Sequence, residues 1–398
     1  MPYSLSAAHL PSDLPSDLPA DPREFFTDVR VVELPMTTRF RGITSRQVCL
    51  LRGPEGWAEF SPFPEYGPQE AHRWLAAAIE FSLNPHGPAG LLDPGASPSS
   101  APPAKAHEVP PAPAYSGRLS GARVPVNGTV PAVSAEDVPG VLDRFDGVGV
   151  FKIKIAEHGA ASKDADVARV RAVLAAAPNA KIRLDANGKL SIDEAVAHLR
   201  KLITLDGFVQ RLEYVEQPVA GVEDMARLRE RLQADSELCG IRIAADENIR
   251  RSDDPLRVAQ LGAADHIVVK AQPLGGVAAA VAIVEACGLP ATVSSALESS
   301  IGLAAGAQLA LALAKLGGQR EPWAAGLGTA SLLAADVVDH PRRPHGGTIS
   351  ADPMDVSVQL AEDHRAPAEA QEWWRARLAA CWKLLREAAA GSVISRAC

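Results

Sequence analysis

Short apolar runs alternate with amphipathic stretches along residues 124–328 of this 398-residue chain. The apolar runs predict strands at 124–130, 151–155, 182–187, 212–217, 241–247, 266–270, 291–295 and, in shorter form, 324–328. Apolar positions recur at helical spacing between them, at 164–177, 192–205, 222–232, 276–287 and 301–316. Each repeat has the length of one strand, one helix and two loops. The pattern predicts a parallel (β/α) barrel of the α/β class.

The residues on either side of this repeat predict further units. Strands at 29–34, 47–52 and 56–60 and a helix at 69–83 indicate a small α+β domain. We therefore predict a disordered Pro- and Asp-rich extension at 1–24, an α+β domain at 25–120 with a Pro/Ala-rich insertion at about 84–118, the barrel at 121–340 and a C-terminal segment at 341–398. Helical spacing over 366–390 predicts a helix that packs on the small domain or the barrel.

Composition narrows the class of protein. Hydrophobic residues make up 47% and charged residues 22%, as in a globular protein, and no apolar run reaches membrane-spanning length. Without a secretion signal, and with five scattered cysteines that form no CxxC pair, we expect a cytoplasmic protein with reduced thiols. A net charge of −8 argues against nucleic acid as a partner. The oligomeric state stays open.

Charged residues fall at the ends of consecutive predicted strands. In 151–155 the side chains alternate, so Lys152 and Lys154 share the face opposite the apolar residues. Asp185, Glu216 and Asp246 end the next three strands, and Lys270 ends the strand after them. Because the C-terminal ends of barrel strands form one rim, we expect these side chains to meet there.

Three carboxylates at one rim require a nearby cation, because like charges raise each other's pKa. An oxygen-only ligand set favours a hard cation, so Asp185, Glu216 and Asp246 predict a Mg²⁺ site, with Mn²⁺ as a substitute. The alternative is that each acid pairs with a lysine or arginine at a strand end. Three acids on consecutive strands favour the metal.

The lysines on either side of the acids predict proton transfer. A buried lysine near other cations has a lowered pKa and can serve as a general base. A metal that binds both oxygens of a substrate carboxylate stabilises the enediolate that forms when the neighbouring C–H proton is removed. The predicted reaction on a small-molecule carboxylate is proton abstraction α to the carboxylate, followed by elimination, epimerisation or cycloisomerisation.

At these residues the chain resembles the muconate lactonising enzyme subgroup of the enolase superfamily, over about residues 28–340. The resemblance implies a modified TIM barrel with an N-terminal capping domain, whose mobile loop would be 38–45. Within the subgroup, other segments resemble the o-succinylbenzoate synthases: 56–63, 124–127, 272–276, 294–300 and 326–329.

The resemblance implies a syn-dehydration of 2-succinyl-6-hydroxy-2,4-cyclohexadiene-1-carboxylate in menaquinone biosynthesis. Lys154 would remove the α-proton and then assist loss of hydroxide, Lys270 would stabilise the enediolate, and Lys152 would lower the pKa of Lys154 and contact the substrate carboxylate. The resemblance also implies a supporting pair and a substrate-binding set around the Mg²⁺ ligands: Asn187 and Glu247, and Asn127, Ser294, Ser295, Gly326 and Leu327, respectively.

Other activities use the same residues. An N-acylamino acid racemase, or another epimerase or cycloisomerase of the subgroup, needs the same two opposed lysines. A dipeptide epimerase would be expected to carry Asp-x-Asp at the eighth strand, and residues 324–328 lack it. An inactive binding barrel is disfavoured because every catalytic position is filled.

Overall fold

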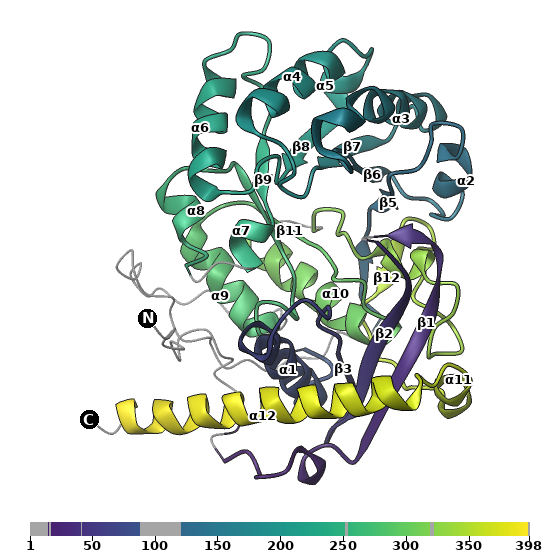
Figure 1. The fold of residues 1–398 in the computed structure, drawn as a ribbon, viewed down its shortest axis with the longest axis vertical. Coiled ribbons are helices and arrows are strands. Elements are labelled where there is room, and N and C mark those ends of the chain that lie inside the picture. The colour runs from purple at the N-terminus through teal and green to yellow at the C-terminus, as the bar shows by residue number, and fades with distance from the viewer. Residues whose placement is uncertain are drawn as a thin grey trace.

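The computed structural model describes residues 15, 17–40, 42–87, 121–250, 254–318 and 322–396 (Figure 1). Most of the predicted extension and residues 88–118 of the predicted insertion lie outside these residues. The extension was expected to reach residue 24, but Leu18 is buried and Pro22–Glu24 forms the 3₁₀ helix η2. The backbone carbonyls of Leu18 and Pro19 accept hydrogen bonds from Arg386 and Trp382, so the packed chain begins earlier than predicted.

The small domain is an antiparallel sheet with one helix on it. Its strands β1 (Asp28–Phe40), β2 (Ile43–Arg52) and β3 (Trp57–Phe60) lie in sequential order, and α1 (Pro68–Leu83) follows. The loop expected at 38–45 is mostly strand, because β1 continues to Phe40, which pairs with Ile43. The register shifts between Pro35 and Phe40, so the hairpin is irregular toward its tip.

The barrel sheet has seven parallel strands in sequential order: β5 (Gly128–Val130), β6 (Val150–Lys154), β7 (Lys181–Asp185), β8 (Leu212–Glu216), β9 (Ile243–Ala245), β10 (His266–Val269) and β11 (Ala291–Val293). The predicted eighth strand is reduced to two bridges, in which Ala325 pairs with Val126 and Gly326 with Ser294. These bridges connect the two ends of the sheet. The predicted (β/α) barrel with an N-terminal α+β domain is confirmed.

Helices cover the barrel between its strands: α2 (Val138–Leu142), η3 (Gly159–Ser162), α3 (Lys163–Ala176), α4 (Ile192–Leu202), α5 (Phe208–Arg211), α6 (Val222–Gln233), α7 (Glu247–Arg250), α8 (Arg257–Gln260), α9 (Val277–Cys287), α10 (Ser300–Leu316) and η4 (Gly328–Leu332). The strand predicted at 124–130 is divided, because β4 (Arg123–Pro125) pairs instead with β12 (Thr348–Ser350) in a separate antiparallel ribbon.

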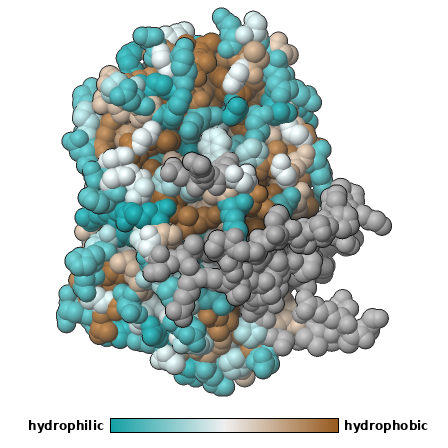
Figure 2. Space-filling model, turned by 180° about the vertical axis from the view of Figure 1, so that it is seen from behind, coloured by the Kyte–Doolittle hydropathy of each residue, from teal (hydrophilic) through white to brown (hydrophobic). Residues whose placement is uncertain are grey.

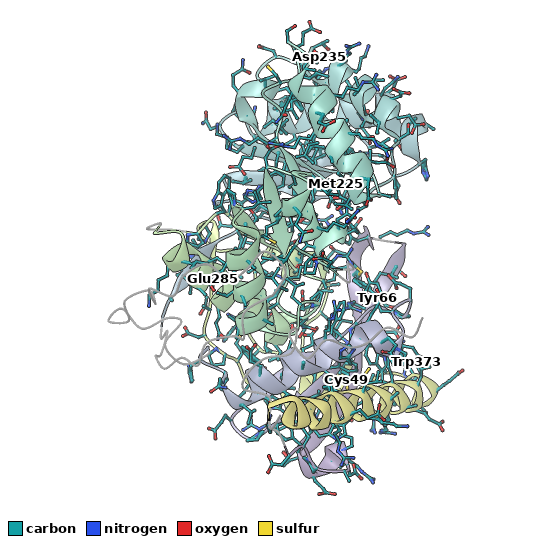
Figure 3. All side chains as sticks on the ribbon, turned by 90° about the vertical axis from the view of Figure 1, so that its left-hand side faces the viewer. Cys49, Tyr66, Met225, Asp235, Glu285 and Trp373 are labelled. Carbon is teal, nitrogen blue, oxygen red and sulfur yellow. The ribbon has the colours of Figure 1, made fainter. Side chains whose placement is uncertain are left out.

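The C-terminal helix α12 (Ala368–Arg396) follows α11 (Val358–Asp363) and lies along α1 of the small domain (Figure 1). Trp374 and Trp382 are buried on its inner face, and the Trp374 indole donates a 3.1 Å hydrogen bond to Gln47 of β2. Trp373 is 43% exposed and lies at the far end of the molecule from Asp235 (Figure 3). The helix therefore completes the core of the small domain.

Two buried carboxylates of the small domain bind the N-termini of barrel helices. Glu80 of α1 accepts hydrogen bonds from the backbone N–H groups of Val277 (2.6 Å) and Ala278 (3.0 Å) at the start of α9. Glu59 of β3 accepts from Ser299 (3.0 Å) and Gly302 (3.2 Å) at the start of α10. A carboxylate is favourable there because these N–H groups have no partner within the helix. The two domains thus share polar contacts as well as apolar packing.

No helix within the described residues is both long and apolar enough to cross a membrane. The face of the molecule shown in Figure 2 mixes hydrophilic and hydrophobic side chains, with polar ones spread over its upper part.

Candidate active site

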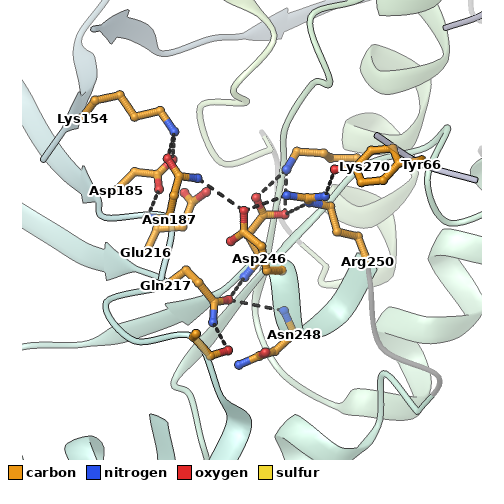
Figure 4. A network of polar contacts seen from close by, with 12 residues as sticks. Tyr66, Lys154, Asp185, Asn187, Glu216, Gln217, Asp246, Asn248, Arg250 and Lys270 are labelled. Carbon is orange, nitrogen blue, oxygen red and sulfur yellow. Dashed lines mark hydrogen bonds and ion pairs between the residues drawn. The ribbon is translucent and has the colours of Figure 1, made fainter. Parts of the chain in front are cut away.

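The rim residues are set by strand register. Lys154 of β6 pairs with Asp185 of β7, and Asp185 pairs with Glu216 of β8, so three charged side chains end neighbouring strands at one level. Asp246 follows the end of β9 and Lys270 follows the end of β10. Figure 4 shows these side chains converging from separate strands.

Each lysine contacts an acid across the rim. Lys154 Nζ lies 2.5 Å from Asp185 Oδ2, and Lys152 Nζ lies 3.1 Å from Glu216 Oε1 and 3.2 Å from Asp185 Oδ2. On the opposite side, Lys270 Nζ lies 2.5 Å from Asp246 Oδ2. The structure therefore brings together all six lysines and acids that the sequence singles out.

Burial and crowding shift the pKa values of these groups. Burial raises the pKa of Glu216 to about 7, and the neighbouring Asp185 carboxylate adds to the increase. Burial also acts to raise the pKa of Asp185, but Lys154 and Lys152 outweigh it and hold that pKa well below its usual range. The acids thus compete for the positive charge at the rim.

The two most deeply buried rim lysines, Lys152 and Lys270, have pKa values that are shifted in opposite directions. Burial acts to lower the pKa of Lys152, but Glu216 and Asp185 outweigh it and raise that pKa above its usual value. Burial lowers the pKa of Lys270, against the opposing effect of Asp246. Lys152 is therefore the more firmly cationic of the two.

The three acids fit a divalent cation by their chemistry. Asp185, Glu216 and Asp246 are at most 3% exposed and offer only oxygen ligands, and the raised pKa of Glu216 indicates that more positive charge would be accommodated. Their oxygens face lysines, however, and among the described residues no three Asp, Glu, His or Cys side chains converge as a ready-made metal site. Metal binding would require these carboxylates to exchange lysine partners for the ion.

Side chains next to the acids hold the rim backbone. Gln217, directly after Glu216, accepts hydrogen bonds through Oε1 from the backbone N–H groups of Asp246 (3.0 Å) and Asn248 (3.3 Å). This role of Gln217 was not predicted from the sequence, although its place directly after a predicted ligand could have indicated it. The proposed supports Asn187 and Glu247 lie 3.3 Å apart, from Nδ2 to Oε1.

Residues with strained backbone conformations gather around the rim and the pocket beside it. The non-glycine residues described with positive φ are Ala156 (57°), Asn187 (48°), Gln217 (39°) and Leu297 (62°). Three of them follow the ends of β6, β7 and β8, and Leu297 lines the pocket. Such conformations persist only where surrounding contacts enforce them, and they are frequent at functional sites.

Arg250 connects the rim to the small domain. It lies 3.1 Å from Asp246 Oδ1 and 2.7 Å from Glu247 Oε1, and it donates a 2.7 Å hydrogen bond to the Tyr66 hydroxyl of the small domain (Figure 4). Arg250 was not predicted from the sequence. Its spacing of four residues from Asp246 places both on one face of a helix and could have indicated the contact.

The pocket above the acids has a free volume of about 40 Å³, because the lysines reach across it to the acids. Of the predicted substrate-binding residues, Ser294, Ser295 and Gly326 line it, whereas Asn127 and Leu327 are not part of its lining. Asn127 is buried and accepts a 3.0 Å hydrogen bond from Arg183. Several lining residues were not predicted from the sequence: Phe40, Phe63, Thr129, Arg250, Ala296, Leu297 and Thr329.

Two parts of this chain match known protein families. Residues 31–82 match the "Enolase N-terminal domain-like" family and residues 141–355 match the "Enolase C-terminal domain-like" family. Muconate lactonizing enzyme from Pseudomonas fluorescens is 20% identical, with a TM-score of 0.62 over 85% of this chain and 98% of that one. The L-Ala-D/L-Glu epimerase from Bacillus subtilis is 21% identical, with a TM-score of 0.60 over 83% and 98%. The chain belongs to the enolase superfamily.

Closer relatives define the family within it. The o-succinylbenzoate synthase of Thermobifida fusca is 45% identical over 88% of this chain and 95% of its own length. That of Mycolicibacterium smegmatis is 43% identical over 90% and 96%. The chain therefore belongs to the o-succinylbenzoate synthase family and is an enzyme of the lyase class, as the sequence resemblance predicted.

Proposed function

We propose that this enzyme converts 2-succinyl-6-hydroxy-2,4-cyclohexadiene-1-carboxylate to 2-succinylbenzoate by a Mg²⁺-dependent syn-dehydration, a step of menaquinone biosynthesis. The observation that carries the proposal is the meeting of three lysines and three acids at one rim, in a chain 45% identical to an o-succinylbenzoate synthase.

Lys154 is the proposed base. In its neutral form it removes the proton α to the substrate carboxylate, and the C–H electron pair moves into the carboxylate to form the enediolate. The enediolate then collapses to a C=C bond as the C–O bond breaks, and the ammonium of Lys154 gives its proton to the departing hydroxide, which leaves as water. One side chain on one face thus performs both transfers, as a syn elimination requires.

The other charged residues bind and stabilise. Asp185, Glu216 and Asp246 are the groups that would hold Mg²⁺, which when bound supplies positive charge to the substrate carboxylate. Lys270, on the far side of the pocket, stabilises the negative charge that develops there. Lys152, whose pKa is raised, remains cationic and orients the carboxylate. Asn187 and Glu247, which are hydrogen-bonded to each other, are the proposed supports of the ligands.

Side chains above the rim shape the substrate site. The centroid of the Phe40 ring, at the end of β1, lies 5.5 Å from Lys154 Nζ, so the ring forms one wall beside the proposed base. Ser294, Ser295 and Gly326 offer hydroxyls and backbone to the succinyl group, and the Ser295 hydroxyl lies 2.8 Å from that of Thr329. Asn127 and Leu327 do not line the pocket and are not proposed to contact the substrate.

The decisive experiment compares substrates. The Mg²⁺-loaded enzyme is assayed with the hydroxycyclohexadiene carboxylate and with N-succinyl amino acids, and kcat/KM is measured for each. We expect dehydration to exceed racemisation by at least about 100-fold, which is roughly 2.7 kcal/mol of differential transition-state binding. Faster racemisation would instead identify an N-acylamino acid racemase. Turnover of neither substrate would favour an inactive binding barrel.

A further inference from the structure

Two buried side chains of helix α3 contact the backbone at the end of β6, the strand that carries Lys154. Arg169 Nη1 donates a 2.9 Å hydrogen bond to the backbone carbonyl of Lys154 and lies 2.7 Å from Asp166 Oδ1. Asp166 Oδ2 accepts a 2.7 Å hydrogen bond from the backbone N–H of Ala156. Asp166 is 0% exposed and Arg169 is 4% exposed. The ion pair therefore binds the backbone on both sides of Ile155.

The strand needs such support at this point. The bond from Ile155 N–H to the Asp185 carbonyl (2.9 Å) continues the pairing with β7 one residue beyond β6. Ala156 then turns the chain with a φ of 57°, which is unfavourable for a residue that has a Cβ. Without the two side chains, the Lys154 carbonyl and the Ala156 N–H would lose buried partners.

The pair is also anchored away from the rim. Arg169 Nε donates a 2.7 Å hydrogen bond to the carbonyl of Val133, and His198 Nε2 of α4 lies 3.4 Å from Asp166 Oδ2. Neither Asp166 nor Arg169 lines the pocket. They therefore do not touch the substrate, and their contacts near Lys154 are to the backbone that carries it.

We propose that Asp166 and Arg169 are positioning residues for Lys154. They fix the backbone from which its side chain extends and so set where Nζ meets the substrate proton. The inference rests on the proposed function, because there Lys154 is the base. A base displaced by a fraction of an ångström loses rate with little loss of substrate affinity.

The chain offers a control at the opposite end of the strands, in an Arg–Asp pair whose side chains are 28% and 22% exposed. Arg229 Nε of α6 donates a 2.8 Å hydrogen bond to Asp265 Oδ1, and Asp265 Oδ2 accepts a 3.0 Å hydrogen bond from the backbone N–H of Ile243. This Arg–Asp pair likewise binds strand backbone, but it does so at the first residue of β9, at the end of the strand that is away from the rim. Loss of either pair disturbs a strand, and only the first disturbs Lys154.

The test compares Arg169→Lys with Arg229→Lys. We expect Arg169→Lys to lower kcat by about 10- to 100-fold while KM changes less than about threefold, and Arg229→Lys to leave both within about twofold. Thermal unfolding is measured for both variants to confirm that they are folded. Normal kcat in Arg169→Lys, or an equal loss in Arg229→Lys, would overturn the proposal. Asp166→Asn, which keeps an acceptor for Ala156, replaces Arg169→Lys if that variant does not fold.

A second readout does not depend on activity. The enzyme is labelled with lysine carrying ¹³C at Cε, and the Lys154 signal is assigned by its loss in Lys154→Ala. Arg169→Lys should shift or broaden that signal, and Arg229→Lys should leave it unchanged. An unmoved Lys154 signal in Arg169→Lys would refute positioning. If the wild-type enzyme proved inactive as a dehydratase, the proposed function would fail while this readout still judged the positioning.

Discussion

Two layers of buried polar side chains lie inside the same barrel, and they differ sharply in charge. Asp185 and Glu216 belong to the rim layer, and Arg183 and Tyr214, two residues earlier on β7 and β8, belong to the layer below. Residues two apart on a strand share one face, so both layers point into the barrel. The rim gathers like charges on neighbouring strands, whereas the lower layer does not.

In the lower layer, a guanidinium group and two aromatic rings lie against one another. The Arg183 guanidinium lies 5.0 Å from the centroid of Tyr214, and the rings of Tyr214 and His266 are stacked at 5.0 Å. His266 Nε2 lies 2.7 Å from the Thr292 hydroxyl, and burial lowers the pKa of His266 to about 3, so the ring is neutral near pH 7. Buried polarity therefore does not mark an active site by itself. Crowded, competing charges do.

The largest expected effect follows from removing a rim lysine. Lys154→Ala and Lys270→Ala should each lower kcat by roughly 10³-fold or more, because the proposed base or the charge opposite it is lost. Steady-state assays measure the rate, and circular dichroism shows whether the variants stay folded. A folded variant with near-normal turnover would remove that lysine from the mechanism.

Removal of the divalent metal should also abolish the dehydration activity. Dialysis against EDTA is expected to reduce dehydration to below about 1% of its initial rate, and added Mg²⁺ should restore it. The control is thermal stability, which should change far less than activity. Turnover that is indifferent to chelation would show that the three acids serve only as partners of the lysines.

Damage to the lower layer should affect stability and spare the chemistry. Tyr214→Leu removes a buried ring between Arg183 and His266, and we expect it to lower the free energy of unfolding by about 2–4 kcal/mol. Its kcat, measured well below the unfolding temperature, should remain within about threefold of wild type. A loss of kcat as large as that of a rim variant would end the distinction between the layers.

The smallest expected effect is the pH dependence of stability that His266 contributes. Because its folded pKa of about 3 lies below the unfolded value near 6.5, the unfolded chain binds the proton more readily, and stability is lost as pH falls from 6.5 toward 3. Between pH 6.5 and 5 this amounts to about 1.6 kcal/mol, because the unfolded histidine is already half protonated at pH 6.5. Denaturant unfolding of wild type and His266→Gln tests it: the variant should lose less stability over this interval, and equal slopes would contradict the assignment.

Sequence periodicity was enough to predict the barrel and its rim charges, because one charged residue per strand recurs at a nearly constant interval. Asp166 and Arg169 were not predicted, since an acid and an arginine three residues apart on a helix usually form an exposed pair. Phe40 and Phe63 reach the pocket only through docking of the small domain. The eighth strand and β12 are too short for periodicity to define their pairing.

The anchoring of Glu59 and Glu80 at the starts of α10 and α9 has a consequence for how the molecule comes apart. Lifting the small domain away would break the hydrogen bonds that join its two carboxylates to four backbone amides of the barrel. Scanning calorimetry should therefore show one endotherm and not two. For the same reason, neither half of the polypeptide is expected to survive as an excised module.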